Sequence, residues 1–260
     1  MDYFTWWLIF ALFFQGFNCS YADDSSENRY AKKAGGPRCK DRPRRCRSAF
    51  GPQKPKCERS SMVPCLEERA LFESLDGKHV LCDTRTDGGG WILIQRIRTP
   101  GHHNEQTWVK YRDGWGSFDQ DFWLGNEMIR KLTMAGYTDL RIDMKYKGRD
   151  HFASYKNFTL TDEADFYRMS YNTAGYRGST QDQLVYSRNM KFSTYDSGAR
   201  ILCNSWAGWW FPTVNGHCGA ANFNGIVGCK HYLKGLYWNV LTGYYDSLDS
   251  VEMKLRKPNP

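Results

Sequence analysis

The chain has 260 residues, a formal net charge of +8 and a hydrophobic content of 41%. This length is enough for one large domain or two small ones with a sizeable core. Residues 23–64 hold 12 Lys or Arg against 5 Asp or Glu, whereas residues 65–260 hold 24 against 22. Nearly all of the excess positive charge therefore lies in one short segment, which excludes a uniformly basic protein.

The N-terminal segment 1–22 is typical of a secretory signal peptide. Its apolar run WWLIFALFF is too short to span a bilayer, and Ser20 and Ala22 suit cleavage after Ala22. Asp2 is atypical, because a basic residue is usual before the apolar run. No later run reaches transmembrane length, so we expect a secreted, extracellular and soluble mature chain. Cleavage would also remove Cys19 and leave eight cysteines, an even number that suits four disulfides.

Residues 23–56 are predicted to form a basic arm outside any core. The stretch GGPRCKDRPRRCRSAFGPQKPKC has four prolines, three cysteines and few large apolar residues. Two functional interpretations compete with that of a solvated spacer: binding to anionic glycans or membranes, and processing at the basic stretch 42–45. A zinc cluster is less favoured, because thiols oxidise in the secretory pathway.

From about residue 66 the sequence changes to short apolar or alternating runs separated by Gly, Asn and Asp. Such runs are typical of strands joined by turns. The clearest predicted strands are 91–97, 140–146, 152–160 and 166–171. Strands of this length mixed with few helices indicate an α+β domain.

One helix is predicted near residue 128. Its apolar positions recur at helical spacing and fall on one face, at Leu124, Met128, Ile129 and Leu132. Gly136 offers a C-terminal stop for this helix.

A turn with three glycines, Asp87–Trp91, comes straight after a cysteine-containing strand. The glycines allow a tight turn on which the Trp91 indole can pack. The turn is followed in order by WVKYRDGWGSFDQDFWLGNEMIRKLT, DLRIDM, FASYKNFTL, YRMSYNTAGYRGSTQDQLVYSRNMKFST, WAGWW, NFNG, GLYW and SVEMKLR. Over residues 57–260 this ordered series resembles the fibrinogen-related domain shared by fibrinogen chains, ficolins, tachylectins, angiopoietins and tenascins.

The resemblance implies an N-terminal subdomain, a central antiparallel sheet and a loop-rich C-terminal subdomain that carries the ligand and calcium sites. The cysteines agree with it, since Cys203 and Cys218 bracket a short Trp-rich loop that a disulfide would hold, for about 3 kcal/mol in the loop-entropy description. The family also ties the strand ending in Cys82 to an upstream cysteine, for which Cys57 and Cys65 both remain open. The cysteines left over, Cys39, Cys46 and Cys229 among them, can pair internally or join chains into a disulfide-linked oligomer.

Calcium is not expected at the usual family site. Family members bind it with an Asp-x-Asp stretch and backbone carbonyls after the FST motif. Here the interval 195–202 reads YDSGARIL, so Asp196 is the only remnant and Arg200 adds a positive charge. Because calcium needs six to eight oxygen ligands, this sequence predicts that the site is lost and that no cofactor is bound.

The resemblance to ficolins and tachylectins implies a funnel of aromatic rings that holds an acetyl group. Matched by motif, the funnel residues here are Phe211, His217, Cys218, Gly219, Tyr232, Leu233 and Tyr244. Phe211 replaces the usual Tyr, and Gly219 stands where the family has His, with His217 on the other side of the cysteine. These rings either line a binding pocket or only pack the subdomain, and the sequence leaves both interpretations open.

The sequence favours a binding protein over an enzyme. It contains no G-x-S-x-G, H-E-x-x-H or Walker A string, and the glycine run opens a strand and not a phosphate-binding helix. Asn157 begins the acceptor sequence N-F-T, which predicts a glycosylation site in a secreted chain.

Two functions therefore compete. The first is a lectin that recognises acetylated or other surface glycans, for example in innate immunity, through weak pockets multiplied by valency. The second is an extracellular-matrix or receptor-binding ligand of angiopoietin or tenascin type, with the arm bound to sulfated glycosaminoglycans. Neither involves nucleic acid.

Overall fold

The structure is a computed structural model, and it describes residues 69–72, 78–102, 104–198, 203, 207–212 and 218–258. The predicted signal peptide, the arm 23–56 and the start of the predicted domain at residue 57 lie outside these ranges.

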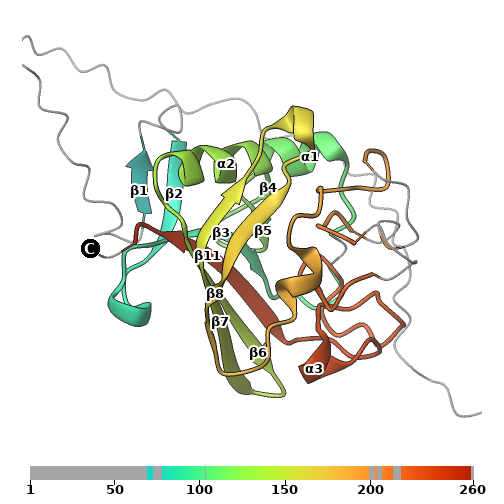
Figure 1. Ribbon diagram of the computed structural model, residues 1–260. Coiled ribbons are helices and arrows are strands. Elements are labelled where there is room, and N and C mark those ends of the chain that lie inside the picture. Colours follow the sequence, from blue (N-terminus) through green and yellow to red (C-terminus); the bar gives the residue numbers. More distant parts are fainter. Residues whose placement is uncertain are drawn as a thin grey trace, which may run out of the picture. The chain divides into compact units, whose positions relative to one another are not determined.

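A single large sheet dominates the described part of the chain (Figure 1). Its strands follow the order β1-β2-β3-β11-β6-β7-β8, and all the paired neighbours are antiparallel. Two short strands extend it, with β5 paired to β3 and β4 paired to β5. The bounds are β1 Arg69–Phe72, β2 Lys78–Asp83, β3 Trp91–Ile97, β4 Trp115–Gly116, β5 Phe122–Trp123, β6 Asp139–Tyr146, β7 Arg149–Leu160, β8 Met169–Gly178 and β11 Ser250–Arg256. This arrangement confirms the α+β class with a central antiparallel sheet.

The last described strand lies in the middle of the sheet. β11 pairs with β3 on one side and with β6 on the other, and Figure 1 shows it in red among green strands. Val251, Met253 and Leu255 on this strand are buried in the main core. The early strands β1–β3 and the middle strands β6–β8 are therefore joined through β11.

Three short α-helices accompany the sheet in the described residues: α1 Trp108–Asp113, α2 Asn126–Met134 and α3 Asn239–Thr242. The buried face of α2 carries Met128, Ile129 and Leu132, as predicted, and these side chains belong to the main core. Leu124 lies outside the helix, because the next residue, Gly125, has a φ of 106° that an α-helix does not accommodate, and α2 begins after it.

The predicted strands agree with the structure at three of four places. Residues 91–97, 140–146 and 152–160 fall within β3, β6 and β7. The prediction of a strand over 166–171 is wrong at its start, since β8 begins at Met169. Phe166 and Tyr167 both have positive φ, because Phe166 ends the 3-10 helix η3 (Glu163–Asp165) in the left-handed region.

The glycine turn before β3 holds a tryptophan and an arginine. Gly88, Gly89 and Gly90 all have positive φ, and a β-carbon on Gly89 would collide with the carbonyl of Thr84. The Trp91 indole donates to the Thr86 carbonyl of the turn at 2.8 Å. From β11, the Arg256 guanidinium lies 4.1 Å from the centre of the Trp91 ring. The turn therefore links β3 to β11.

The C-terminal part after β8 is rich in loops and is held by buried aromatic rings. Before β11, its regular elements among the described residues are the 3-10 helix η4 (Leu184–Ser187), the helix α3 and the two-stranded sheet of β9 (Ala221–Asn222) and β10 (Tyr237–Trp238). The rings of Trp209 and Phe223 meet edge to face, and Phe223 stacks on Trp238. All three are fully buried, so apolar burial replaces regular backbone pairing here.

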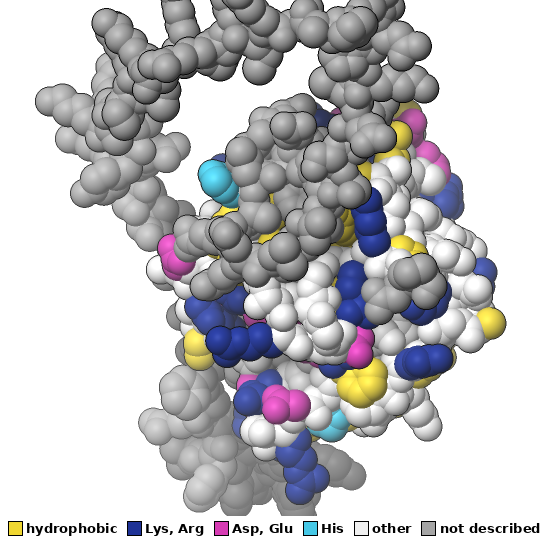
Figure 2. All heavy atoms as spheres, turned by 90° about the vertical axis from the view of Figure 1, so that its left-hand side faces the viewer, with side chains coloured by type: hydrophobic (Ala, Val, Ile, Leu, Met, Phe, Trp, Pro, Cys, Tyr) yellow, Lys and Arg dark blue, Asp and Glu magenta, His cyan; other side chains and the backbone are white. Residues whose placement is uncertain are grey.

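The surface of the described residues is mostly polar. On the face shown in Figure 2, Lys and Arg side chains lie beside Asp and Glu, and hydrophobic side chains appear in separate small areas. Surface ion pairs of the described residues include Arg168–Asp165 at 2.8 Å. Scattered charges of both signs favour solubility more than stability.

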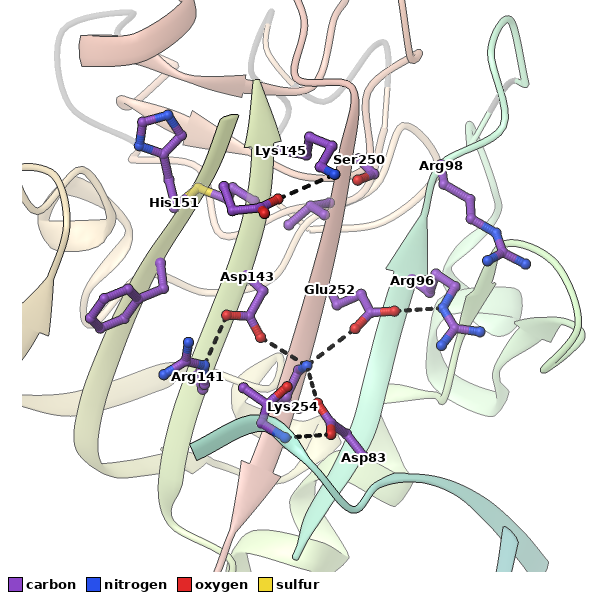
Figure 3. Close-up of a pocket in the computed structure, with 15 residues that line it drawn as sticks. Asp83, Arg96, Arg98, Arg141, Asp143, Lys145, His151, Ser250, Glu252 and Lys254 are labelled. Atoms are coloured by element: carbon purple, nitrogen blue, oxygen red, sulfur yellow. Dashed lines mark hydrogen bonds and ion pairs between the residues drawn. The ribbon is translucent and has the colours of Figure 1, made fainter. Parts of the chain in front are cut away.

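A lysine is buried in the central strand. The Lys254 side chain is 2% exposed, and its Nζ lies 2.8 Å from Asp83 Oδ2, 2.8 Å from Asp143 Oδ2 and 3.1 Å from Glu252 Oε2 (Figure 3). These carboxylates come from the end of β2, from β6 and from β11 itself. Burial alone would raise the pKa of Asp83, but hydrogen bonds from Lys254, Thr86 and Arg85 hold that pKa well below its usual range.

We expect Lys254→Met to lower the free energy of unfolding by about 3 to 5 kcal/mol, because three carboxylates would lose a shared buried cation. Urea unfolding at pH 7 measures this change. Lys147→Met is the matched control, since that side chain is 69% exposed and pairs with Asp246 at the surface. Equal stability of the two variants would contradict a structural role for the lysine.

The loss of stability in Lys254→Met should depend on pH. The folded pKa of Asp83 is depressed below its ordinary value of 3.8, so its contribution to stability is present above about pH 4. It is lost progressively as the pH falls from about 4 towards the much lower pKa of the folded state, and over that range the stability difference between Lys254→Met and Lys147→Met should shrink.

Candidate functional site

A disulfide marks the centre of the predicted binding region. Cys203 and Cys218 are joined, with 5.2 Å between their Cα atoms, and both are buried. The Tyr237 hydroxyl donates to the Cys218 carbonyl at 3.0 Å and fixes the second cysteine against β10. Cys82 and Cys229 each take part in a disulfide as well. The choice between Cys57 and Cys65 for Cys82 lies outside the described residues.

Four tyrosines gather beside this disulfide, and we call Tyr186, Tyr232, Tyr244 and Tyr245 the tyrosine cluster. Tyr186, Tyr232 and Tyr245 are 58%, 53% and 66% exposed. The ring of Tyr232 lies 5.1 Å from that of Tyr245 and 6.0 Å from that of Tyr244. Burial, and then the neighbouring hydroxyls of Tyr232 and Tyr186, raise the pKa of Tyr244. The rings of Tyr232, Tyr244 and Tyr245 are thus in contact, and Tyr186 lies close enough to influence Tyr244 electrostatically.

Three loops bring the cluster together. Tyr186 comes from η4, Tyr232 from the loop after Cys229, and the other two tyrosines follow α3. Leu233, in the left-handed region at φ 61°, donates its N–H to the Tyr244 carbonyl at 2.8 Å. This bond clamps the two later loops, so the tyrosines are presented by a fixed backbone.

The predicted funnel residues are only partly brought together. The rings of Tyr232 and Tyr244 are in contact, and Leu233 is half-buried with its backbone bonded to Tyr244. Phe211 is 1% exposed and belongs to the main core, so its ring does not reach the surface beside the tyrosines. His217 lies outside the described residues.

Gly219 shapes the edge of the cluster. Its φ is 75°, and a β-carbon there would stand 3.2 Å from Pro212 Cδ and 3.8 Å from Tyr186 Cβ. A side chain at this position would be strained and would press on Pro212, whereas glycine leaves Tyr186 room beside Cys218.

Sequence reasoning missed Tyr186 and Tyr245. Tyr245 directly follows a predicted residue, and the pair Tyr244-Tyr245 is a signal that two neighbouring rings are available. Tyr186 lies 46 residues before Tyr232 in the sequence, and only the tertiary fold brings it to the same surface.

Basic side chains flank the tyrosine cluster. The segment 228–234 reads GCKHYLK, with Lys230 and His231 exposed and without an acidic residue. Arg188 is half-buried just after η4 and donates to the Tyr171 carbonyl. The surface therefore combines flat amphipathic rings with positive charge, a combination that suits binding.

The family description "Fibrinogen beta and gamma chains, C-terminal globular domain" matches residues 56–259. The chain belongs to this family. The domain of this family is a non-enzymatic binding domain, and proteins that contain it bind extracellular ligands or receptors.

Named relatives of this fibrinogen-like chain include large modular proteins. It is 34% identical to human tenascin-R over 205 residues, which cover 77% of this chain and 14% of tenascin-R. It is 35% identical to bovine angiopoietin-4 over 191 residues, covering 69% of this chain and 37% of that protein. The chain thus spans well under half the length of either relative.

Solved structures share the fold. The fibrinogen-like globe domain of human ANGPTL2 is 32% identical with a TM-score of 0.63, and the match covers 70% of this chain and 86% of that one. A lamprey fibrin D-dimer in complex with the peptide Gly-His-Arg-Pro-amide is 25% identical with a TM-score of 0.62, covering 75% of this chain and 71% of that one.

Of the interval that the family implies for calcium, residues 195–198 are described, and their one carboxylate already has partners within the protein. Asp196 Oδ1 accepts the Trp108 backbone N–H of α1 at 2.9 Å and the Thr194 hydroxyl at 2.7 Å. Thr194 and Ser197 close the loop with backbone hydrogen bonds. The described residues hold no group of three or more His, Cys, Asp or Glu side chains placed to bind a metal ion. The carboxylate thus ties its loop to α1.

Within the same ranges, none of the helices has the length and apolar character needed to cross a bilayer.

We expect calcium to leave thermal unfolding unchanged, because the Asp196 carboxylate already has two internal donors. Calorimetry in calcium and in EDTA should give the same midpoint. Asp196→Ala should lower the unfolding free energy by about 1 kcal/mol in both buffers. Asp150→Ala, at an 84% exposed side chain, is the control. An unfolding midpoint that rises with calcium in the wild type but not in Asp196→Ala would show that Asp196 binds calcium.

Proposed function

We propose that this chain is a secreted extracellular-matrix or receptor-binding ligand whose contact surface is the tyrosine cluster. The observation that carries the proposal is the exposure of Tyr186, Tyr232 and Tyr245, with the Tyr232 ring in contact with those of Tyr244 and Tyr245. Tyrosine offers a large, rigid contact area with a polar tip, and it is enriched where proteins bind proteins.

The relatives support a ligand of this type. Tenascin-R and angiopoietin-4 are extracellular proteins, and the matched segment is the fibrinogen-like part of each. The signal-like segment 1–22 and the even number of cysteines after it also favour secretion. In this proposal the basic arm 23–56 holds the protein to sulfated glycans of the matrix.

A lectin that recognises acetylated glycans is the second candidate, and it is favoured by the contact between Tyr232 and Tyr244. Burial of Phe211 weighs against it, because the aromatic funnel would lose one of its rings. A shallow pocket of this sort binds one acetyl group at about the millimolar level, so activity would need several domains per particle.

We expect Tyr232→Ser combined with Tyr245→Ser to reduce receptor binding at least about tenfold, because exposed aromatic anchors dominate such contacts. The measurement is binding of the purified chain to an array of receptor ectodomains, followed by titration of the positives. Met134→Ala, at a 72% exposed side chain on α2, is the matched control. Equal binding by the double variant would remove the tyrosine cluster from the proposal.

A glycan array separates the two candidates. Binding that N-acetylglucosamine competes and EDTA leaves intact would support the lectin. Absence of glycan binding, together with a tyrosine-dependent receptor, supports the ligand.

We also expect Asn157 to carry an N-linked glycan when the chain is secreted from animal cells. Asn157 is exposed on β7 at a φ of 57°, where the pairing with β8 shifts register, so its side chain is accessible for glycosylation. Removal of glycans by amidase should lower the mass of the wild type. Thr159→Ala is the diagnostic variant, since it abolishes the acceptor sequence and leaves the strained Asn157 in place. An amidase-sensitive mass in that variant would place the glycan elsewhere.

A further inference from the structure

The open face of the central sheet contains a polar groove. A cavity of about 500 Å³ runs across β3, β11, β6 and β7 (Figure 3). Its lining is dominated by charged and hydroxyl side chains, among them Arg96, Arg98, Arg141, Asp143, Lys145 and Ser250.

Strand register orders these side chains into rows. Glu252 lies opposite Arg96 on one side and opposite Asp143 on the other, and the Arg96–Glu252 ion pair measures 2.7 Å. Arg141 pairs with Asp143 at 2.8 Å. With Lys254 included, the charged side chains on the floor of the groove are paired with one another. They therefore have little capacity to bind a ligand.

The upper rim differs from the floor. Lys145 lies opposite Ser250 across the β6–β11 ladder, and the pairing of Val251 with Ile97 brings Arg98 beside Ser250 on the other side. Neighbouring strands lie about 4.8 Å apart, so the Cα atoms of Arg98 and Lys145 are about 10 Å apart with a hydroxyl between them. Figure 3 shows Lys145 and Ser250 together, with Arg98 across the groove.

Both rim cations are available to an anion. Arg98 is exposed, its Nη2 donates to the Asp119 carbonyl at 2.8 Å, and among the described residues its guanidinium forms no ion pair with a carboxylate, although its backbone N–H donates to Asp121. Lys145 is 46% exposed and lies 3.3 Å from Asp150, which is 84% exposed. An exposed pair of this kind is weak and readily exchanged for another anion.

We propose that Arg98, Ser250 and Lys145 form a binding site for a sulfated oligosaccharide on the open face of the sheet. A protein partner would need an apolar anchor, yet none of the exposed large hydrophobic side chains of the described residues lines this groove. Phe152, the aromatic residue in the lining, is covered by Arg141 at 4.5 Å. Spaced cations with a hydroxyl donor match the sulfate groups of a glycan chain.

None of the residues of this site belongs to the tyrosine cluster or to the segment 23–56. A sulfated glycan held on the sheet would leave the tyrosine cluster free for a receptor. The proposal therefore survives if the tyrosine cluster fails its own test.

Lysine footprinting on the full mature chain tests the site directly. Acetylation rates are measured by mass spectrometry with a heparin oligosaccharide, with an unsulfated hyaluronan oligosaccharide and without a glycan. Lys191 is the matched control, since it is 43% exposed and lies 3.4 Å from Asp165. We expect heparin to slow acetylation of Lys145 several-fold and leave Lys191 unchanged. Equal acetylation rates of Lys145 with and without heparin would overturn the proposal. Equal protection by hyaluronan would overturn sulfate recognition, because the carboxylates of hyaluronan would then be sufficient for binding.

Charge-matched variants supply an independent readout. Arg98→Gln with Lys145→Gln should weaken heparin-oligosaccharide binding about tenfold in calorimetry. Arg112→Gln with Lys191→Gln removes the same charge elsewhere and keeps the arm, so its affinity should fall less than about twofold. Unfolding midpoints confirm that each variant is folded. Equal losses in the two variants would reduce the effect to net charge and reject the site.

Discussion

A buried ammonium group shared by three carboxylates organises the centre of this domain. Lys254 lies on β11 and reaches Asp83 at the end of β2 and Asp143 on β6, so one side chain ties together three strands that are far apart in the sequence. Burying a charge is costly unless its partners are close, and here all three oxygens lie within 3.1 Å. The arrangement fixes the register of the central strand, because a shift by one residue would turn Lys254 into the apolar core.

The strand pattern was largely readable from the sequence, and the position of the lysine was not. Alternation in SVEMKLR predicts a strand with one polar face, and on that reading Lys254 belongs to the solvent. Its burial depends on Asp83, which is 171 residues away along the chain. The start of β8 was misjudged for a related reason, since Phe166 and Tyr167 look like strand residues but turn sharply to pack beside Trp108.

The binding region shows a similar division. Motif matching located Tyr232, Tyr244 and the cysteine loop, because these residues are close to recognisable sequence landmarks. It placed Phe211 with them, whereas the fold buries that ring and supplies Tyr186 from a distant 3-10 helix. In a loop-rich region the sequence does not separate buried from exposed aromatic residues, because the same residue types serve in both positions.

The central position of β11 in the sheet also affects folding during synthesis of the domain. Residues 250–256 are synthesised after both of their neighbours, yet they separate β3 from β6 in the finished sheet. Until they leave the ribosome, both of those strands have an open edge, and such edges invite pairing with other nascent chains. The sheet can therefore close only after almost the whole domain has been translated, and a product truncated just before residue 250 would lack its middle strand.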